Sequence, residues 1–162
     1  MTLATWLLTF SCYANWLPGD RRGYVTRAPG SASHKAPPNG WLCAWTERAL
    51  RQPPFLLDAP ARAVVDDAIR DQCIHAGWQL HAVHVRTNHV HVVVTGAAPP
   101  ERIMRQLKAW ATRRLREAAR IDRDRRVWAR HGSTVPLRDG DEVRAACRYV
   151  VEGQGGPLEG EA

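Results

Sequence analysis

The fold of this chain is decided by one stretch, residues 84–94, which reads HVRTNHVHVVV. Apolar and polar residues alternate along it, and this alternation predicts two strands, over about 78–85 and 88–95, that are joined as a hairpin. Successive side chains of a strand point to opposite faces, so His89 and His91 share one face while the intervening valines share the other. The valine face is expected to pack against helices, which leaves the histidine face outside that core.

The remaining elements are predicted from apolar periodicity and from helix-end signals such as Asp58, Gly77 and the Pro99-Pro100-Glu101 start. In chain order they are a strand over 3–13, a helix over about 59–76, a helix from 99 to about 119, a strand near 127–136 and a helix over about 141–152. With the hairpin, the first six elements predict an α+β fold, a ferredoxin-like antiparallel sheet with helices on one face. The C-terminal helix is left to cover the other face, which carries the histidines.

Residues 14–57 differ in composition, because four Pro-Gly or Pro-Pro pairs interrupt them. Such pairs favour turns, so long regular elements are not expected there. We interpret residues 1–162 as a single domain that carries this stretch as an extended insertion. Its three tryptophans, Trp16, Trp41 and Trp45, indicate that the insertion packs at least in part onto the body.

Composition indicates a globular protein with an acidic partner, because the 162 residues carry a formal net charge of +7. The four cysteines are scattered and form no C-x-x-C pair, which argues against a zinc knuckle or a redox motif. No stretch approaches the roughly 20 apolar residues that cross a bilayer, and the short apolar start lacks the basic residues of a signal peptide. We therefore expect no membrane partner and a reducing, cytoplasmic location.

Two imidazoles on one face of a strand, offset by two residues, can hold one divalent ion. Paired histidines also occur as plain decoration of a solvated sheet face, and this alternative stays open. His84 belongs to the same face and, with Arg86-Thr87 as a two-residue turn, is expected opposite His89. It could be a metal ligand or a group that orients one, although a structural role is commoner.

The segment from Asn88 to Val94 resembles the HUH signature of the single-tyrosine transposases, a group that includes the REP-associated tyrosine transposases. In this signature two histidines flank a large apolar residue, after an asparagine and before an apolar strand. Four further segments resemble segments of these proteins in the same order: 16–23 (WLPGDRRG), 107–110 (LKAW), 128–134 (WARHGST) and 148–150 (RYV). The resemblance therefore runs over nearly the whole chain.

The resemblance implies that Tyr149 is the nucleophile and that His89 and His91 bind the metal. Tyr149 also lies in the helix expected over the histidine face, unlike the other tyrosines, Tyr13 and Tyr24. A phenol has a pKa near 10, which makes it a poor nucleophile when neutral but a tolerable leaving group.

The third metal ligand departs from the family pattern. The family usually supplies it one helical turn after the tyrosine, often as a glutamine at i+4, but position 153 is Gly153 and the glutamine is Gln154. Gly153 is suited to ending the helix and could bring Gln154 back toward the histidines. Gln154 is the preferred ligand and Glu152, at i+3, is its rival.

The function that the resemblance implies is a metal-dependent, transposase-like endonuclease and strand transferase acting on single-stranded DNA near hairpins, with Mg or Mn as cofactor. It implies a covalent 5′-phosphotyrosine and a free 3′-OH, which can reverse the attack and rejoin strands without ATP. One alternative is a DNA-binding module that has lost catalysis and acts as a repressor or structure-specific binder; a phosphoesterase without a covalent intermediate is another. The family includes active sites built within one chain and between two chains, so a homodimer stays open.

The excess positive charge is concentrated in residues 101–130, where eleven basic and four acidic residues give +7, the formal net charge of the whole chain. Arginine dominance favours phosphate recognition, because the guanidinium fork grips two oxygens. The DNA-binding residues expected here are Arg105, Lys108, Arg113, Arg114 and Arg116. The alternative is a solvated helix face in an arginine-rich sequence. Four tryptophans could stack on unpaired bases: Trp16, Trp41, Trp45 and Trp128. Most of them are expected instead to be anchors of the core or of loops.

Overall fold

Strand β5 (His89–Gly96) separates the molecule into two layers. Its residues Val90, Val92 and Val94 are fully buried in the main core, together with residues of two helices. Val93 is also fully buried, but it belongs to a second, smaller core on the opposite face of the sheet. The two-residue alternation predicted from the sequence is therefore confirmed, and both faces of this strand are covered.

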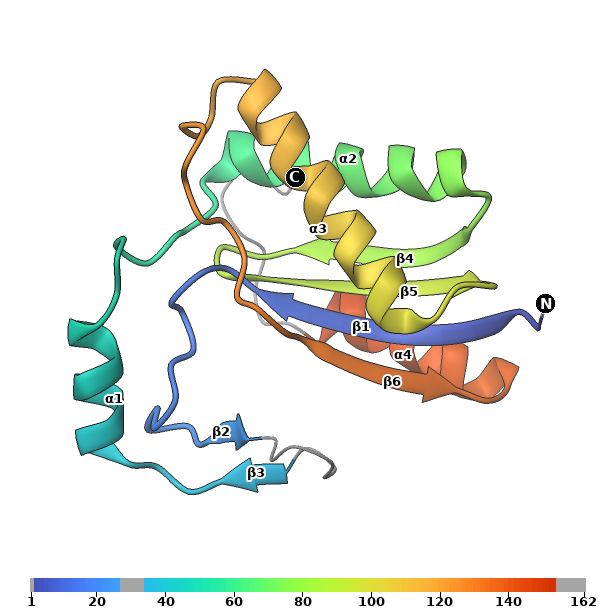
Figure 1. Cartoon of the computed structure of the whole chain (residues 1–162). Coiled ribbons are helices and arrows are strands. Elements are labelled where there is room, and N and C mark those ends of the chain that lie inside the picture. Colours follow the sequence, from blue (N-terminus) through green and yellow to red (C-terminus); the bar gives the residue numbers. More distant parts are fainter. Residues whose placement is uncertain (1, 27–33, 154–162) are drawn as a thin grey trace.

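A computed structural model describes residues 2–26 and 34–153 of the chain. Its main sheet has the antiparallel order β4-β5-β1-β6 (Figure 1). The strands that join β5 in this sheet are β1 (Ala4–Ser11), β4 (Gln79–Val85) and β6 (Ser133–Leu137). Helices α2 (Ala59–Ala76) and α3 (Pro100–Glu117) cover one face, and α4 (Gly140–Glu152) covers the other. The chain thus has the predicted ferredoxin-like α+β fold, with the C-terminal helix over the histidine face.

Helix α2 begins and ends where the sequence signals place its ends. The Asp58 carboxylate accepts a hydrogen bond from the Ala61 amide at 2.9 Å, which satisfies one of the donors left over in the first turn. Gly77 ends the helix with a left-handed φ of 68°, a conformation that glycine adopts without strain. These two caps fix the length of the helix that packs beside α3.

Helix α3 holds the main core together. Its fully buried residues recur every four positions and so form one stripe: Ile103, Leu107, Ala111 and Leu115. Full burial of each large aliphatic side chain contributes roughly 1.5–3 kcal/mol, so this stripe accounts for a large share of the stabilisation of the layer. No helix in the described part of the chain has the length and apolar character needed to cross a membrane.

The turn of the β4–β5 hairpin lies one residue later than predicted. The Arg86 amide bonds to the His89 carbonyl at 2.8 Å, so the turn residues are Thr87 and Asn88 instead of Arg86 and Thr87. As a result His84 lies opposite His91, not opposite His89, although it stays on the predicted face. The backbone carbonyls of Thr87 and Asn88 accept hydrogen bonds from Leu57 and Cys12, and these tertiary contacts fix the turn in place.

The strand predicted near 127–136 is shorter than expected, because regular pairing begins only at Ser133. Trp128 forms a single bridge to Cys12. The carbonyls of Ala129 and His131 instead accept hydrogen bonds from the Lys108 ammonium, at 2.9 and 3.1 Å. Burial lowers the pKa of this ammonium to about 8. A side chain of α3 therefore takes the place of a strand partner.

Short elements form within the insertion: β2 (Tyr24–Thr26), β3 (His34–Ala36) and α1 (Gly40–Arg48). The nine-residue α1 is longer than the proline pattern allowed for, because Asn39 caps it by accepting a hydrogen bond from the Leu42 amide at 3.0 Å. The insertion packs onto the body in part, as expected, through Leu57 and Phe55. The tryptophans do not carry this packing, because Trp16, Trp41 and Trp45 are all exposed and α1 buries none of its residues. Figure 1 shows these elements as a projection beside the sheet.

The packing of the segment that leads into β6 can be tested at Gly132, where an added Cβ would overlap the Thr9 carbonyl and the Met104 sulfur. Gly132→Ala should lower the free energy of unfolding by roughly 1–3 kcal/mol, the cost of forcing an added methyl group against neighbouring atoms that must shift to make room. The matched control is Gly40→Ala, because no atom lies within 4 Å of a Cβ at that position. Equal denaturation midpoints for the two variants would show that residues 129–132 do not pack against β1 as described.

Candidate active site

A row of polar side chains crosses the sheet face beneath α4. His91 in β5 has His84 of β4 on one side and Thr9 of β1 on the other. His91 is only 5% exposed, and a buried imidazole needs hydrogen-bond partners. The Thr9 hydroxyl lies 2.8 Å from His91 Nδ1 and so fixes the orientation of the ring.

His89 lies beside His91 at the start of β5, with the two ring centroids 4.8 Å apart and the ring planes at 82°. Its Nδ1 lies 2.7 Å from the Asn88 side-chain oxygen. Because an amide oxygen only accepts, Nδ1 carries the proton and the lone pair is on Nε2. An oxygen partner at Nδ1 is the arrangement that orients imidazoles in metal sites.

Helix α4 is placed over this row by a small apolar core and one polar contact. Ala146 and Val150 of α4 pack against Ala82 and Val93 of the sheet. His84 Nδ1 donates a hydrogen bond to the Val150 carbonyl at 2.9 Å, in the last turn of the helix. His84 thus links the sheet face to α4. This is a structural role, one of the roles that the sequence left open for His84.

Tyr149 precedes Val150, and its ring lies against His91. The ring centroids are 5.7 Å apart, and the planes meet at 76°. Tyr149 is also 49% exposed, so a ligand can approach it from solvent. The structure therefore brings together three of the residues predicted for the site, because the His91 ring lies beside that of His89 and that of Tyr149.

The two imidazoles have the chemistry of a divalent-metal site, since neutral imidazole is a ligand for transition metals. Gln154, the preferred third ligand, lies outside the described residues. Its rival Glu152 is exposed at the end of α4. Within residues 2–26 and 34–153, no group of three or more His, Cys, Asp and Glu side chains is placed to hold a metal.

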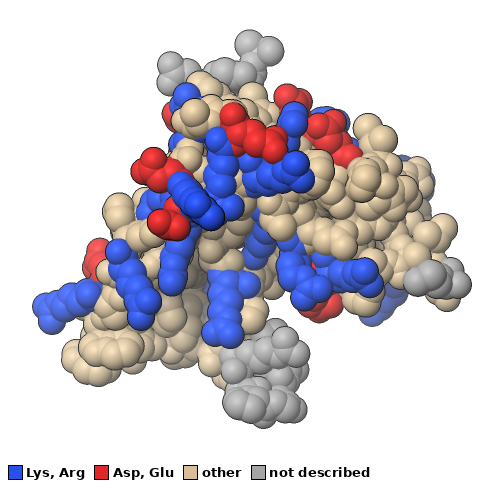
Figure 2. All heavy atoms as spheres, turned by 45° about the horizontal axis from the view of Figure 1, so that its top comes forward, with Lys and Arg blue, Asp and Glu red and all other residues tan. Residues whose placement is uncertain are grey.

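The predicted DNA-binding residues all lie on α3, on the far side of the sheet from the histidines. Arg113 forms an ion pair with Glu117 at 2.8 Å, and Arg114 lies 3.7 Å from Asp71. Lys108 is committed to two backbone carbonyls. Figure 2 shows lysine and arginine side chains spread over the face in view, with acidic side chains among them.

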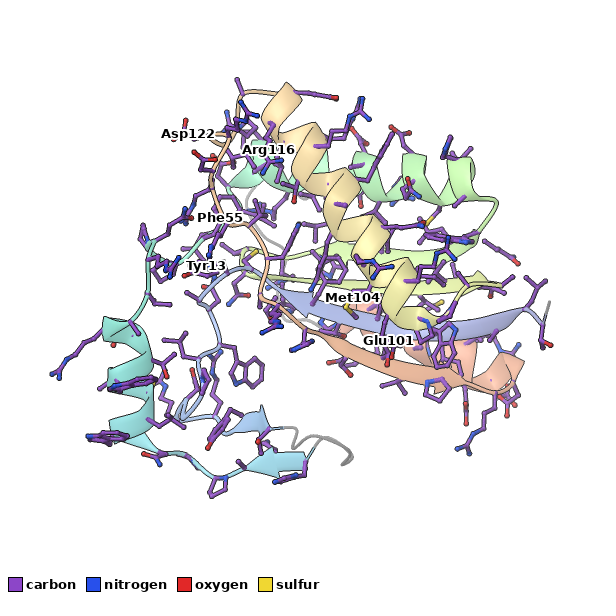
Figure 3. All side chains as sticks on the ribbon, viewed as in Figure 1. Tyr13, Phe55, Glu101, Met104, Arg116 and Asp122 are labelled. Atoms are coloured by element: carbon purple, nitrogen blue, oxygen red, sulfur yellow. The ribbon has the colours of Figure 1, made fainter. Side chains whose placement is uncertain are left out.

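Arg105 and Arg116 are exposed and eleven residues apart, which on a helix of 3.6 residues per turn places them on the same face. Arg116 is seen near the C-terminal end of α3 in Figure 3. The structure does not bring these arginines together with Tyr149, because the sheet lies between them. Any contact that they make with DNA is away from the tyrosine.

Sequence reasoning missed Thr9, which holds His91. Only the register between β1 and β5 reveals this partner, and the polar–apolar alternation of β1 gives no register. The contact between Asn88 and His89 is different, because the two residues are adjacent and the motif already contains both.

Comparison with known proteins gives the chain a family. Residues 53–152 match the family model described as IS200-like transposase. One similar solved structure is the REP-associated tyrosine transposase bound to a REP hairpin, with 15% identity and a TM-score of 0.48; the match covers 91% of this chain and 64% of that protein. This chain therefore spans less than two thirds of that protein's length.

A second similar structure is a protein described as a transposase from Deinococcus radiodurans R1, with 13% identity and a TM-score of 0.47; 97% of this chain and 95% of that chain are covered. No curated protein matches the chain. The family match spans well over half of the sequence, so the chain belongs to the IS200-like transposases.

Proposed function

We propose that this protein is a metal-dependent endonuclease and strand transferase for single-stranded DNA, with Tyr149 as its nucleophile. The observation that carries this proposal is the position of Tyr149, half exposed and with its ring 5.7 Å from that of His91. A tyrosine that served only to pack α4 would be buried with Ala146 and Val150.

The covalent step is a transesterification. The Tyr149 hydroxyl oxygen attacks the scissile phosphorus as its proton leaves, and the bond from phosphorus to the 3′ oxygen breaks. The products are a 5′-phosphotyrosine and a 3′ oxygen that takes up a proton. Attack by a 3′-OH on the phosphotyrosine reverses this exchange, so strands are transferred without an external energy source.

His89 and His91 would hold a divalent ion, Mg or Mn, with Gln154 as the preferred third ligand and Glu152 as the rival. The histidines would thereby place a positive charge where it can neutralise the scissile phosphate. Thr9 and Asn88 keep the two imidazoles in fixed orientations, through contacts of 2.8 and 2.7 Å at Nδ1. Because these partners occupy Nδ1, each ring would meet the ion through Nε2.

The substrate class follows from the family and from the charge of the chain. A formal net charge of +7 suits a nucleic acid. DNA hairpins flanked by single strands are the proposed substrate. The proposal takes all three groups from one copy of the chain, because the Tyr149 ring lies against His91, which in turn lies beside His89.

Removal of the metal ligands tests the metal. His89→Ala and His91→Ala should each abolish cleavage of a hairpin-bearing single strand in Mn or Mg, and excess chelator should do the same to wild type. His89→Ala is the cleaner variant, because His91 is buried and its loss leaves a cavity beside Thr9. Full cleavage in chelator would mean that the histidines hold no ion needed for the reaction.

Substitution of the nucleophile tests the covalent step. Tyr149→Phe keeps the ring against His91 but has no hydroxyl, so both cleavage and the covalent adduct on a denaturing gel should vanish while DNA binding persists. Tyr13→Phe and Tyr24→Phe are matched controls and should keep the adduct. An adduct in Tyr149→Phe would assign the attack to another residue, and cleavage by wild type without any adduct would point to a water nucleophile.

Neutralisation of α3 tests the arginines. Arg105→Gln with Arg116→Gln should weaken DNA binding and reduce the salt dependence of log K by roughly 0.7 per lost contact to a single strand. Arg113→Gln, which removes a residue already paired with Glu117, should change the slope less. Identical slopes for wild type and all variants would leave these residues as a solvated helix face.

A further inference from the structure

We propose that the exposed face of α1, formed by Trp41, Trp45 and Arg48, is a stacking platform for unpaired bases of the DNA that flanks the cleavage site. The inference rests on the proposed function for its choice of DNA as the ligand. It assigns a binding site to the insertion, which the reaction at Tyr149 does not use.

The exposure of the two indoles is the first observation. Trp41 is 75% exposed and Trp45 is 58% exposed. They are four residues apart on one helix and therefore lie on the same face, which continues to Arg48 three residues further on. Clustered exposed aromatic residues mark interaction sites, because a folded protein gains nothing from leaving them in water.

The third tryptophan of the insertion has a different task. The Trp16 indole donates a hydrogen bond to the Gly23 carbonyl at 2.7 Å, and the Arg22 guanidinium lies 4.5 Å from its ring centroid. Arg22 is held in turn by the Asp20 carboxylate through bonds of 2.7 Å. The Trp16 indole, although 49% exposed, is thus tied into the 16–23 turn by these contacts, whereas the two indoles of α1 are more exposed.

This turn holds α1 at its N-terminal end. Gly19 has a φ of 86°, and its carbonyl accepts a hydrogen bond from the Asn39 amide at 2.9 Å. A Cβ at Gly19 would overlap the Asn39 carbonyl, so only glycine permits this approach. The exposed indoles therefore belong to a helix with a fixed support.

The far end of the insertion is also fastened. The Gln52 side-chain oxygen accepts a hydrogen bond from the Arg126 amide at 2.8 Å, and the Phe55 amide bonds to the Tyr13 carbonyl at 3.0 Å. Figure 3 shows Tyr13 and Phe55 at the place where the insertion meets the body. A supported, solvent-facing aromatic pair is the geometry of a preformed binding surface.

Charge selects the class of ligand. The described parts of the insertion, 14–26 and 34–57, contain five lysine and arginine residues and two acidic residues. Stacking of bases on aromatic side chains, with nearby cations for the phosphates, is the pattern by which proteins hold single strands. A second copy of this chain fits the surface less well, because each copy carries +7 and the surface is itself basic.

The position of the insertion matches a strand that leaves the active site. Strand β1 ends at Ser11, which is paired with His89, and the chain enters the insertion within the next few residues. The insertion therefore starts at the end of the sheet that carries His89. Unpaired nucleotides beside the scissile phosphate are the part of the substrate closest to this end.

The experiment measures binding in the Tyr149→Phe background, so that no cleavage occurs. Fluorescence anisotropy compares a labelled hairpin with single-stranded tails against the same hairpin without tails. Trp41→Ala with Trp45→Ala should weaken binding of the tailed hairpin roughly tenfold or more, and should leave the blunt hairpin unchanged. Ile74→Ala on α2, which removes another exposed apolar side chain (79% exposed), is the control and should change neither.

Rescue and assembly sharpen the result. Trp41→Tyr with Trp45→Tyr should restore most of the affinity for the tails, because a phenol ring also stacks. Equal affinity of the double alanine variant and its parent for the tailed hairpin would overturn the platform. So would equal losses on tailed and blunt hairpins, or a change from dimer to monomer in light scattering with DNA binding intact.

Failure of the proposed function gives a different pattern. If Tyr149 is not the nucleophile, the wild-type protein forms no adduct, yet the tail-specific loss in the double alanine variant remains. If the platform is wrong but the function is right, the adduct forms and the tail-specific loss is absent.

Discussion

The two-residue period of β5 is the constraint on which the rest of the structure depends. Its alternate valines pack in the core against α2 and α3, and its histidines therefore lie on the opposite face of the sheet, toward α4. A slip of one residue would turn both imidazoles into the main core and turn Val90, Val92 and Val94 toward α4. Because His91 is buried even on its proper face, it depends on Thr9, and so the register between β1 and β5 is fixed by a polar contact as well as by packing.

Periodicity and end signals were sufficient to predict the elements, because they are local: Asp58 and Gly77 delimit α2 as the sequence indicated. The same local patterns could not place the hairpin turn, which is set by contacts from Leu57 and Cys12, far away in sequence. Nor could they show that α1 leaves its tryptophans in solvent, since exposure depends on what packs nearby. The candidate site was predicted as a set of residues, but its distances and its positioning groups depend on tertiary register.

The segments that resemble the transposases divide into two kinds. Residues 16–23 form a closed turn around Trp16, and 107–110 and 128–134 are joined through Lys108, whose ammonium and carbonyl both bond to the second segment. These segments build the scaffold. The chemistry expected of the family is confined to β5 and the end of α4, where the rings of His91 and Tyr149 meet. The order of these segments along the chain therefore supports the fold. Only the histidine motif in β5 and the 148–150 segment in α4 bear on the proposed reaction.

The two-layer design limits the path of a bound strand. A phosphate beside Tyr149 lies on the α4 side of the sheet, whereas the arginines of α3 lie on the other side, so one short strand cannot lie along both. Arg113 and Arg114 already have carboxylate neighbours, so the free energy that each would gain by binding a phosphate is smaller. The insertion has the opposite character: it leaves the sheet at the histidine end, it is held at both of its own ends, and it presents indoles to solvent. A substrate that must enter at Tyr149 would reach this surface first, and the helical layer only by passing the edge of the sheet.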